Sequence, residues 1–458
     1  MSARGRAAAD RFLASLDRLI LKTFFRQIEV VGAENVPATG PLLVAANHGN
    51  SLVDPMLVFG FLPRPSRFLA KSTLWRHPAA KYLVRLAAAI PVYRRQDPGD
   101  SSKNVEAFAR SHEELATGGV IAIFPEGLSH SEPALAPLKT GVARIALGAE
   151  RRFGPLGMSI VPVGLNFEDP ETFRSRVLIQ IGEGISVPAI GGDDDENKER
   201  VRSLTAEVEA ALRRVTLNYD SWRQAELLDC AASVYSRGEV EAPLRQRLSE
   251  QFELKKSFLA GYRRLEAEDP RLVRPVLAAT ERYDDLLRDV GLEDRHVAAT
   301  YPRALVVRFV LRHLWSVTLW RPLTLAGLVL NWLPYRIPGW VTRLARVQPD
   351  VRATWKVLIS VVLFPLFWAL ESVFAGWNWG WPWGLVTLAA APLTGYLALT
   401  YSESWRALRD ESRAFLKLKG RRAAVAELTR RRREVAAEVE RLIDVHRRKF
   451  AAANPASG

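Results

Sequence analysis

The chain has 458 residues, 48% of them hydrophobic, which is enough apolar material for two or three folded domains and excludes a disordered protein. A formal net charge of +14 favours a polyanionic partner, and 13 tryptophans with two long apolar stretches favour a membrane over nucleic acid. The single cysteine, Cys230, excludes an internal disulfide and a cysteine-based zinc site, and fits a reducing compartment.

Residues 1–26 are predicted to form an amphipathic helix. Apolar residues recur at helical spacing from Phe12 to Phe25, and Asp17, Arg18 and Lys22 interrupt the run, so it lacks the pattern of a signal peptide. We expect the apolar face to lie either on lipid or on the domain that follows.

Residues 27–190 alternate short apolar runs with helical stretches, which predicts an α/β domain with a mixed sheet flanked by helices. The expected strands are 27–32, 41–46, 67–70, 88–93, 120–124, 159–167 and 176–181. The expected helices are 54–61, 74–86, 102–117 and 138–149.

A histidine and an aspartate follow the strand at 41–46. His48 stands at the strand's exit and Asp54 in the first turn of the next helix, for which Asn50 or Ser51 is the expected cap. A carboxylate there can accept a hydrogen bond from imidazole Nδ1–H and leave Nε2 to take a proton from a substrate hydroxyl. The alternative is a capping aspartate beside a loop histidine that bonds to backbone.

Three further residues of this domain are candidates for binding a substrate. Arg94, followed by Arg95, presents a guanidinium fork for a phosphate, unless it is a solvated strand end. Glu126 projects from a tight turn, where it can bond a substrate hydroxyl or hold an arginine. Lys139, at the start of the helix expected at 138–149, adds a cation where helix N–H groups favour an anion. His48 and Asp54 make only two plausible metal ligands, so no metal is expected.

Four segments together resemble the motifs of the glycerophospholipid acyltransferases: Asn47-His48 with Asp54, Ile90-Pro-Val-Tyr-Arg94, Phe124-Pro-Glu-Gly127 with Ser129, and Val161-Pro-Val163. The Glu-Gly-Leu-Ser-His form of the third motif and the two-span C-terminal region more closely resemble the branch that acylates glycerol 3-phosphate or dihydroxyacetone phosphate. Lysophosphatidate acyltransferases usually have Glu-Gly-Thr-Arg-Ser there. The family's arginine is therefore missing, and His130, Lys139 or Arg144 are candidates to replace it.

The resemblance implies transfer of a fatty acyl group from acyl-CoA or acyl carrier protein to the sn-1 hydroxyl, with the acyl thioester as co-substrate and no other cofactor. The implied residues are His48 and Asp54 for catalysis and, for substrate binding, Arg94, Glu126, Gly127, Ser129 and Lys139. Two alternatives stay open: a lysophosphatidate acyltransferase, and a non-enzymatic membrane scaffold. A nucleic-acid binder is least expected, because the positive charge is concentrated beside the apolar spans.

The remaining chain is predicted to be helical. Residues 191–303 form an expected helical subdomain, and residues 304–401 a membrane region. In that region 314–332 is interrupted by Arg321-Pro322 and reads as interfacial, whereas 357–374 and 383–401 each approach the ~20 residues that cross a bilayer. Buried helices of a soluble protein are the alternative.

Residues 402–458 form an expected basic helical tail. Between residues 403 and 450 stand 15 Lys and Arg residues against 8 Asp and Glu residues, which predicts a cytoplasmic location. A hairpin returns the chain to its starting side, so the α/β domain is expected in the cytoplasm too. The apolar residues of the tail predict either self-association as a coiled coil or attachment to anionic lipid.

Overall fold

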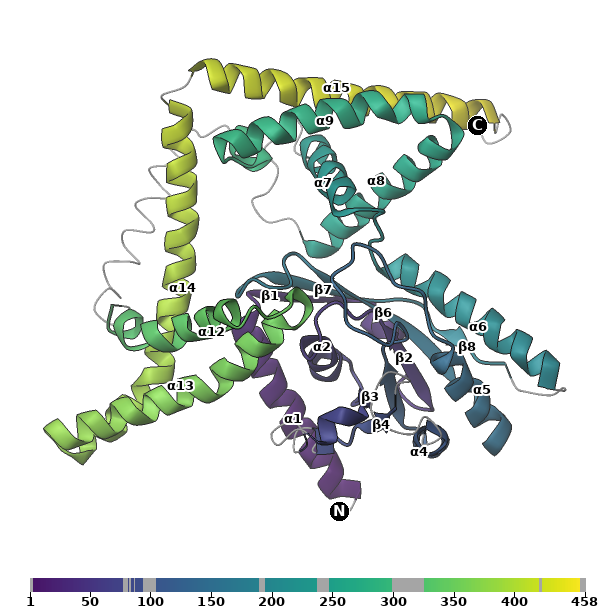
Figure 1. The fold of residues 1–458 in the computed structure, drawn as a ribbon, viewed down its shortest axis with the longest axis vertical. Coiled ribbons are helices and arrows are strands. Elements are labelled where there is room, and N and C mark those ends of the chain that lie inside the picture. Colours follow the sequence, from purple (N-terminus) through teal and green to yellow (C-terminus); the bar gives the residue numbers. More distant parts are fainter. Residues whose placement is uncertain are drawn as a thin grey trace. The chain divides into compact units, whose positions relative to one another are not determined.

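The computed structural model describes residues 3–76, 81, 84–85, 87–93, 104–188, 194–236, 247–298, 325–419 and 422–453 (Figure 1). Two compact units are present: Met1–Asn218 with Thr342–Leu358, and Tyr219–Val341 with Ile359–Gly458. Arg94, and most of the segment expected to be interfacial, lie outside the described residues.

The first unit is built on a mixed sheet, as predicted. The strand order is β1-β7-β6-β2-β5-β3-β4, with β8 paired to β6. Only the pairs of β6 with β7 and β8 are antiparallel among the described strands. The bounds are β1 (Gln27–Val31), β2 (Leu42–Ala46), β3 (Arg67–Lys71), β4 (Ile90–Val92), β5 (Val120–Ile123), β6 (Ser159–Phe167), β7 (Arg176–Ile181) and β8 (Ile185–Ser186).

Helices cover both faces of this sheet because its central strands are apolar on both sides (Figure 1). In β2, Leu42, Val44 and Ala46 point to one core and Leu43 and Ala45 to the other. The first core is closed by α1 (Ala3–Phe24), α2 (Val53–Phe61) and the start of α13 (Pro349–Trp379). The second is closed by α4 (Asn104–Ala116), α5 (Gly141–Phe153) and α6 (Asp194–Val215). By sequence α6 lies in the expected helical subdomain, yet it packs on the sheet.

Helix α1 lies on the domain through one face. Leu21 and Phe24 belong to the first core, and Asp10 pairs with Arg67 at 2.7 Å. Its opposite face keeps apolar side chains exposed, with Phe12 at 69%. One face of α1 therefore packs on the α/β domain, which is one of the two predicted positions, and a second apolar face of the helix remains exposed.

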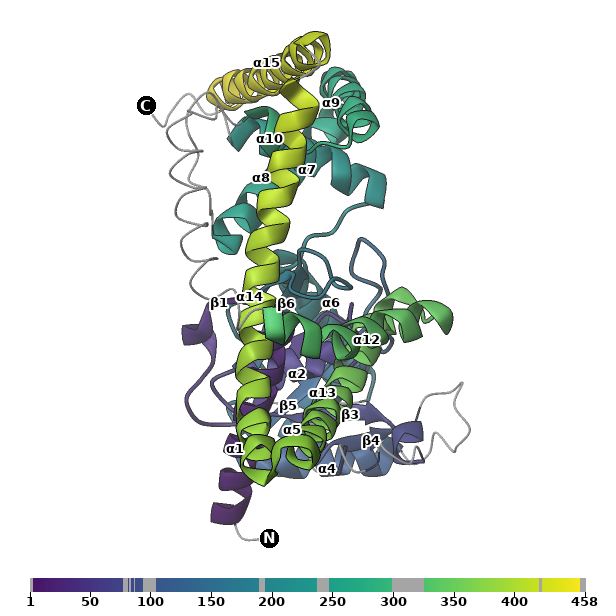
Figure 2. The same ribbon diagram turned by 90° about the vertical axis from the view of Figure 1, so that its left-hand side faces the viewer.

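The second unit contains a helical bundle. Its helices are α7 (Trp222–Ser236), α8 (Leu248–Glu268), α9 (Pro270–Val290), α10 (Asp294–Ala298) and α15 (Arg422–Ala453). Figures 1 and 2 show α15 lying along α9, and Leu428, Val435 and Val439 of α15 are buried in the same core as Tyr283 and Leu287. These tail residues, on which the prediction of a coiled coil or lipid contact relied, are thus occupied within the chain.

Two helices are long and apolar enough to cross a membrane: α13, and the first part of α14 (Trp381–Lys419), up to Glu403. Only 6% of the most apolar window of α13 is buried, which disfavours a core helix of a soluble protein. The two helices pack tightly where they meet, because Ser372 Oγ donates to the Gly384 carbonyl at 2.6 Å and a Cβ on Gly384 would lie 3.2 Å from the Gly376 Cα. A preceding helix, α12 (Trp332–Leu344), completes this region.

Candidate active site

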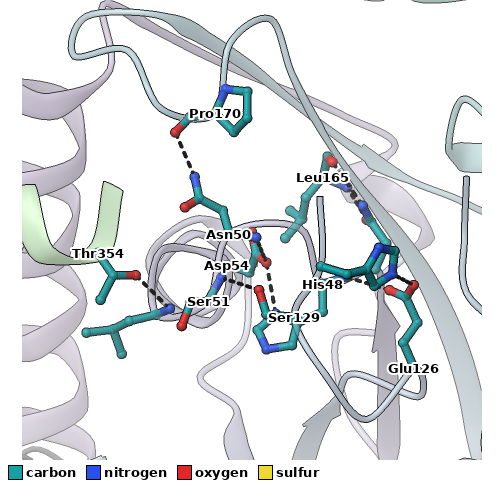
Figure 3. A network of polar contacts seen from close by, with 12 residues as sticks. His48, Asn50, Ser51, Asp54, Glu126, Ser129, Leu165, Pro170 and Thr354 are labelled. Atoms are coloured by element: carbon teal, nitrogen blue, oxygen red, sulfur yellow. Dashed lines mark hydrogen bonds and ion pairs between the residues drawn. The ribbon is translucent and has the colours of Figure 1, made fainter. Parts of the chain in front are cut away.

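The site forms where the carboxyl ends of two parallel strands meet. β2 and β5 are neighbours in the sheet, with Ala45 opposite Ile123, so the loop with His48 and the turn with Glu126 leave the sheet side by side (Figure 3). The rings of His48 and Phe124 stack, with centroids 4.2 Å apart and planes 19° apart. Phe124 therefore restrains the plane of the imidazole.

His48 and Asp54 form a bonded pair. His48 Nδ1 lies 2.9 Å from Asp54 Oδ2, which also accepts from the Asn50 amide at 2.7 Å. Asp54 is fully buried; burial raises its pKa, and the hydrogen bonds from His48 and Asn50 act in the opposite direction. When Asp54 is ionised its carboxylate can only accept, so His48 then carries its proton on Nδ1 and leaves Nε2 unprotonated.

Glu126 braces the site through its carboxylate. Oε1 accepts from the His48 backbone amide at 2.7 Å, and Oε2 accepts from the Ala136 amide at 2.8 Å and from His130 Nε2. Its side chain is almost completely buried. The predicted partner of Glu126 was a substrate hydroxyl or an arginine, whereas in the structure both oxygens accept from protein donors, one of them a histidine.

His130 links the two motifs. Its backbone amide donates to the His48 carbonyl at 3.1 Å, and its Nδ1 accepts from the Glu132 amide at 3.2 Å. The bond with Glu126 raises the pKa of His130. Because both ring nitrogens already have protein partners, His130 serves as a brace in this geometry.

The other residues expected to bind substrate differ in position. Ser129 Oγ accepts from the Ser51 amide at 3.1 Å, so it too ties the third motif to the catalytic loop. Gly127 has φ +74°, the left-handed conformation that glycine adopts readily, and a Cβ there would lie 2.6 Å from Lys139 Nζ. Lys139 is exposed and precedes α5, which begins only at Gly141. It therefore does not open that helix as predicted.

A pocket opens beside His48. Its lining residues come from the catalytic loop, the third motif, the segment after it and the end of α6: Asn47, His48, Gly49, Glu126, His130, Glu132, Pro133, Ala134, Leu135, Thr216 and Leu217. Sequence reasoning missed the contribution of Thr216 and Leu217, which no local pattern links to the site. It also missed the role of Asn47, whose side-chain amide makes two hydrogen bonds with the backbone of Leu165, at 3.1 and 2.7 Å.

The start of the helix after the catalytic loop differs from the prediction. Leu52 is the N-cap of α2, instead of Asn50 or Ser51. Asn50 contributes its backbone carbonyl to the Val53 amide, while its side chain donates to the Pro170 carbonyl at 3.0 Å. Within the described ranges, no group of three His, Cys, Asp or Glu residues is arranged to hold a metal ion.

Comparison with known families matches two segments of the chain. Residues 27–166 match the acyltransferase family, and residues 345–447 match the family described as the glycerol-3-phosphate acyltransferase 2 C-terminal domain. The first match covers the strands and loops that carry His48, Asp54 and Glu126. The second begins just before α13 and ends within α15.

Known proteins are similar over parts of their length. Glycerol-3-phosphate O-acyltransferase 2 of Saccharomyces cerevisiae is 30% identical over 59% of this chain and 38% of its own, and glycerol-3-phosphate O-acyltransferase 1 of the same yeast is 24% identical over 84% and 63%. The crystal structure of a 1-acyl-sn-glycerophosphate acyltransferase from Thermotoga maritima has 21% identity and a TM-score of 0.33, over 46% of this chain and 83% of that one. The chain spans 38 to 66% of the length of the first three curated relatives.

Proposed function

We propose that this chain is a glycerol-3-phosphate O-acyltransferase, because residues 27–166 match the acyltransferase family. It transfers a fatty acyl group from a thioester, acyl-CoA or acyl carrier protein, to the sn-1 hydroxyl of glycerol 3-phosphate or dihydroxyacetone phosphate. The match of residues 345–447 to a glycerol-3-phosphate acyltransferase domain, and the names of the two yeast relatives, support this acceptor over lysophosphatidate.

One observation carries the proposal: the pairing of His48 Nδ1 with the buried Asp54 at 2.9 Å, beside a pocket that His48 lines. In the proposed reaction His48 Nε2 takes the proton of the sn-1 hydroxyl while that oxygen bonds to the thioester carbonyl carbon. Asp54 holds the ring and stabilises the imidazolium that results. When the tetrahedral intermediate collapses, the C–S bond breaks, and the proton on His48 passes to the leaving thiolate.

The phosphate of the acceptor is proposed to bind two cations, of which Arg94 lies outside the described residues. Arg94 and Lys139 are the proposed partners, since a guanidinium and an ammonium suit a phosphate monoester. Gly127 and Ser129 are proposed to border the glycerol, and Glu126 to fix the loop that does so. The reaction needs no metal and no cofactor other than the acyl thioester.

The chain is further proposed to be an integral membrane protein. The apolar stretches of α13 and α14 support two spans. The excess of Lys and Arg after the second span supports a cytoplasmic location for α15 and, through the hairpin, for the catalytic domain. Anionic lipid is the proposed partner of the Lys and Arg residues that follow the second span in the sequence.

The test is acyl transfer by the purified full-length protein in detergent micelles. Radiolabelled palmitoyl-CoA or palmitoyl carrier protein is offered with glycerol 3-phosphate, dihydroxyacetone phosphate and 1-acyl-glycerol 3-phosphate in parallel reactions. His48→Ala is the inactive control. Arg110→Ala, which changes an exposed residue of α4, is the matched surface control.

Transfer to a small phosphate acceptor that disappears in His48→Ala and persists in Arg110→Ala would support the proposal and identify the acceptor. Transfer to the lysolipid alone would replace it by a lysophosphatidate acyltransferase. If neither donor supports transfer to any acceptor, a non-enzymatic membrane scaffold becomes the better description.

A further inference from the structure

We propose that the first turns of α13 are part of the catalytic scaffold and that Thr354 is a positioning residue for the loop between His48 and Asp54. This inference rests on the proposed acyltransferase function. It adds that the helix proposed to cross the membrane also holds the catalytic loop in place, through contacts made within the first unit by residues 349–358.

The catalytic loop is fixed through its backbone amides. After His48, the amide of Asn50 donates to Asp54, that of Ser51 to Ser129 Oγ, and that of Leu52 to Thr354 Oγ1 at 3.0 Å (Figure 3). Two of these acceptors are hydroxyls that come from elsewhere in the chain. The loop thus takes its shape from distant segments as well as from its own sequence.

That shape is strained. Ser51 has φ +40°, in the left-handed region that a residue with a Cβ rarely adopts. Such a conformation persists only where the surroundings impose it. The hydroxyls of Ser129 and Thr354 hold the amides of Ser51 and of the next residue, so they grip the chain at the strained turn itself.

Thr354 is placed for this role by buried packing. Its side chain is 8% exposed, and its neighbours Ala353 and Val357 are buried in the same core as Val53 and Leu57 of α2. The start of α13 therefore lies against the helix that carries Asp54. Leu52 is the N-cap of that helix, where backbone amides have no partner inside the helix, and Thr354 supplies one.

A second contact reaches the same loop from α13. Arg352 forms an ion pair with Glu171, and Lys356 Nζ donates to the Glu171 carbonyl at 2.6 Å. The residue before it, Pro170, accepts from the Asn50 side chain at 3.0 Å. Helix α13 thus bears on Asn50 through the turn at residues 169–171, and on Leu52 directly.

The experiment compares Thr354→Val with Thr354→Ser in the full-length protein. Valine keeps the shape of threonine and removes the hydroxyl, whereas serine keeps the hydroxyl. Thr205→Val is the matched control, because Thr205 is also 8% exposed and, among the described residues, its hydroxyl bonds to the carbonyl of Val201 in its own helix, on the other face of the sheet.

Thr354→Val should lower kcat by about tenfold or more, since small displacements of a catalytic group are costly. The KM for each substrate should stay within about twofold, while Thr354→Ser and Thr205→Val remain near wild type. In parallel, hydrogen exchange over residues 49–56 should be faster in Thr354→Val than in the wild-type protein, and unchanged in Thr205→Val. Exchange needs no turnover, so it tests the scaffold even if the proposed acyltransferase activity fails.

Unchanged exchange over residues 49–56 in Thr354→Val would overturn the inference whatever the activity. Equal losses of kcat in Thr354→Val and Thr354→Ser would also overturn it, because the hydroxyl would then not be the group that acts. If Thr354→Val does not fold, Arg352→Met, which breaks the contact with Glu171, replaces it, with the same exchange and kcat measurements deciding the outcome.

Discussion

Replacing Asp54 by asparagine tests how the imidazole of His48 is held. In the structure Asp54 Oδ2 accepts both from His48 Nδ1 and from the Asn50 amide, whereas Oδ1 finds no hydrogen-bond partner among the described residues. An asparagine must place its oxygen at the Oδ2 position, because an NH2 group there would face the Asn50 N–H, a second donor. His48 should therefore keep its proton on Nδ1.

The expected loss is that of a charge alone. A hydrogen bond to a charged group contributes about 1.5–3 kcal/mol and a neutral one about 0.5–1.5 kcal/mol, so the difference is ~1–1.5 kcal/mol. That corresponds to roughly a tenfold fall in kcat. Asp54→Ala removes the bond as well and frees the ring, so it should approach the ~10²–10⁴-fold loss expected when general-base catalysis is removed, as in His48→Ala.

The assay is kcat for acyl transfer to the acceptor identified above, with both substrates saturating. The four proteins are wild type, Asp54→Asn, Asp54→Ala and His48→Ala. The thermal unfolding midpoint of each is measured in the same detergent, so that misfolded protein is not counted as inactive enzyme.

A loss of 10³-fold or more in Asp54→Asn, with an unchanged unfolding midpoint, would refute this reasoning. It would mean that the amide had turned its NH2 toward His48 and reversed the tautomer, a change that costs about 10⁴-fold in a serine protease whose aspartate holds the histidine in the same way. The Asn50 amide would then not decide which oxygen faces the ring.

Three further substitutions test other parts of the structure. Glu126→Gln should lower the free energy of unfolding by about 1–3 kcal/mol in denaturant titrations, more than Asp54→Asn does. Both oxygens of Glu126 accept from donors, one of them His130, so an NH2 group in place of either oxygen would face a donor. Stability equal to wild type would contradict this. Burial raises the pKa of Asp17 to about 8. Between pH 3.8 and about 8 the folded protein therefore keeps a proton on Asp17 that the unfolded chain has released. Stability should therefore fall as pH rises from about 4 to about 8, and the unfolding midpoint of Asp17→Asn relative to wild type should rise over that range; a constant difference would count against the assignment. Gly164→Ala should lower the unfolding midpoint by about 5 °C or more, because a Cβ there would lie 1.8 Å from the Val215 carbonyl oxygen; a midpoint like that of wild type would show that α6 is free to move away.

The elements of the sheet could be predicted because their signals are local. β6 and β7 have the predicted bounds, Ser159–Phe167 and Arg176–Ile181, since buried strands are apolar runs that end at turn residues. The pairing of His48 with Asp54 is local too, because a strand exit and the first turn of the next helix bring the two side chains together.

The rest of the site depends on contacts that no local pattern encodes. Leu52 and Thr354 are separated by 302 positions, and Asn47 and Leu165 by 118. Glu126 shows the same limit, since a carboxylate at a tight turn can face a substrate or the protein, and only the fold shows that it accepts from His130 and from backbone amides.

Amphipathic helices show a further limit. The apolar positions of α15 predicted a buried face, but their spacing is the same whether the face meets lipid, a second copy or the chain's own bundle. The structure places Leu428, Val435 and Val439 in the bundle. For α6 the same kind of pattern meets the sheet, through Val208 and Leu212.

The packing of α15 against α9 sets an order of events during synthesis. About 140 residues separate the end of α9 at Val290 from Leu428, and at translation rates of ~5–20 residues per second that stretch takes roughly 7–28 s. During this time α15 has not yet been synthesised, so the apolar surface around Tyr283 and Leu287 lacks the helix that packs on it in the structure. Helix α13 and the apolar part of α14 precede α15 in the chain, so the bundle can be completed only after both apolar helices have left the ribosome. A chain that stops before Leu428 would leave this apolar surface exposed, and exposed surface of this kind makes a partly folded chain prone to aggregation.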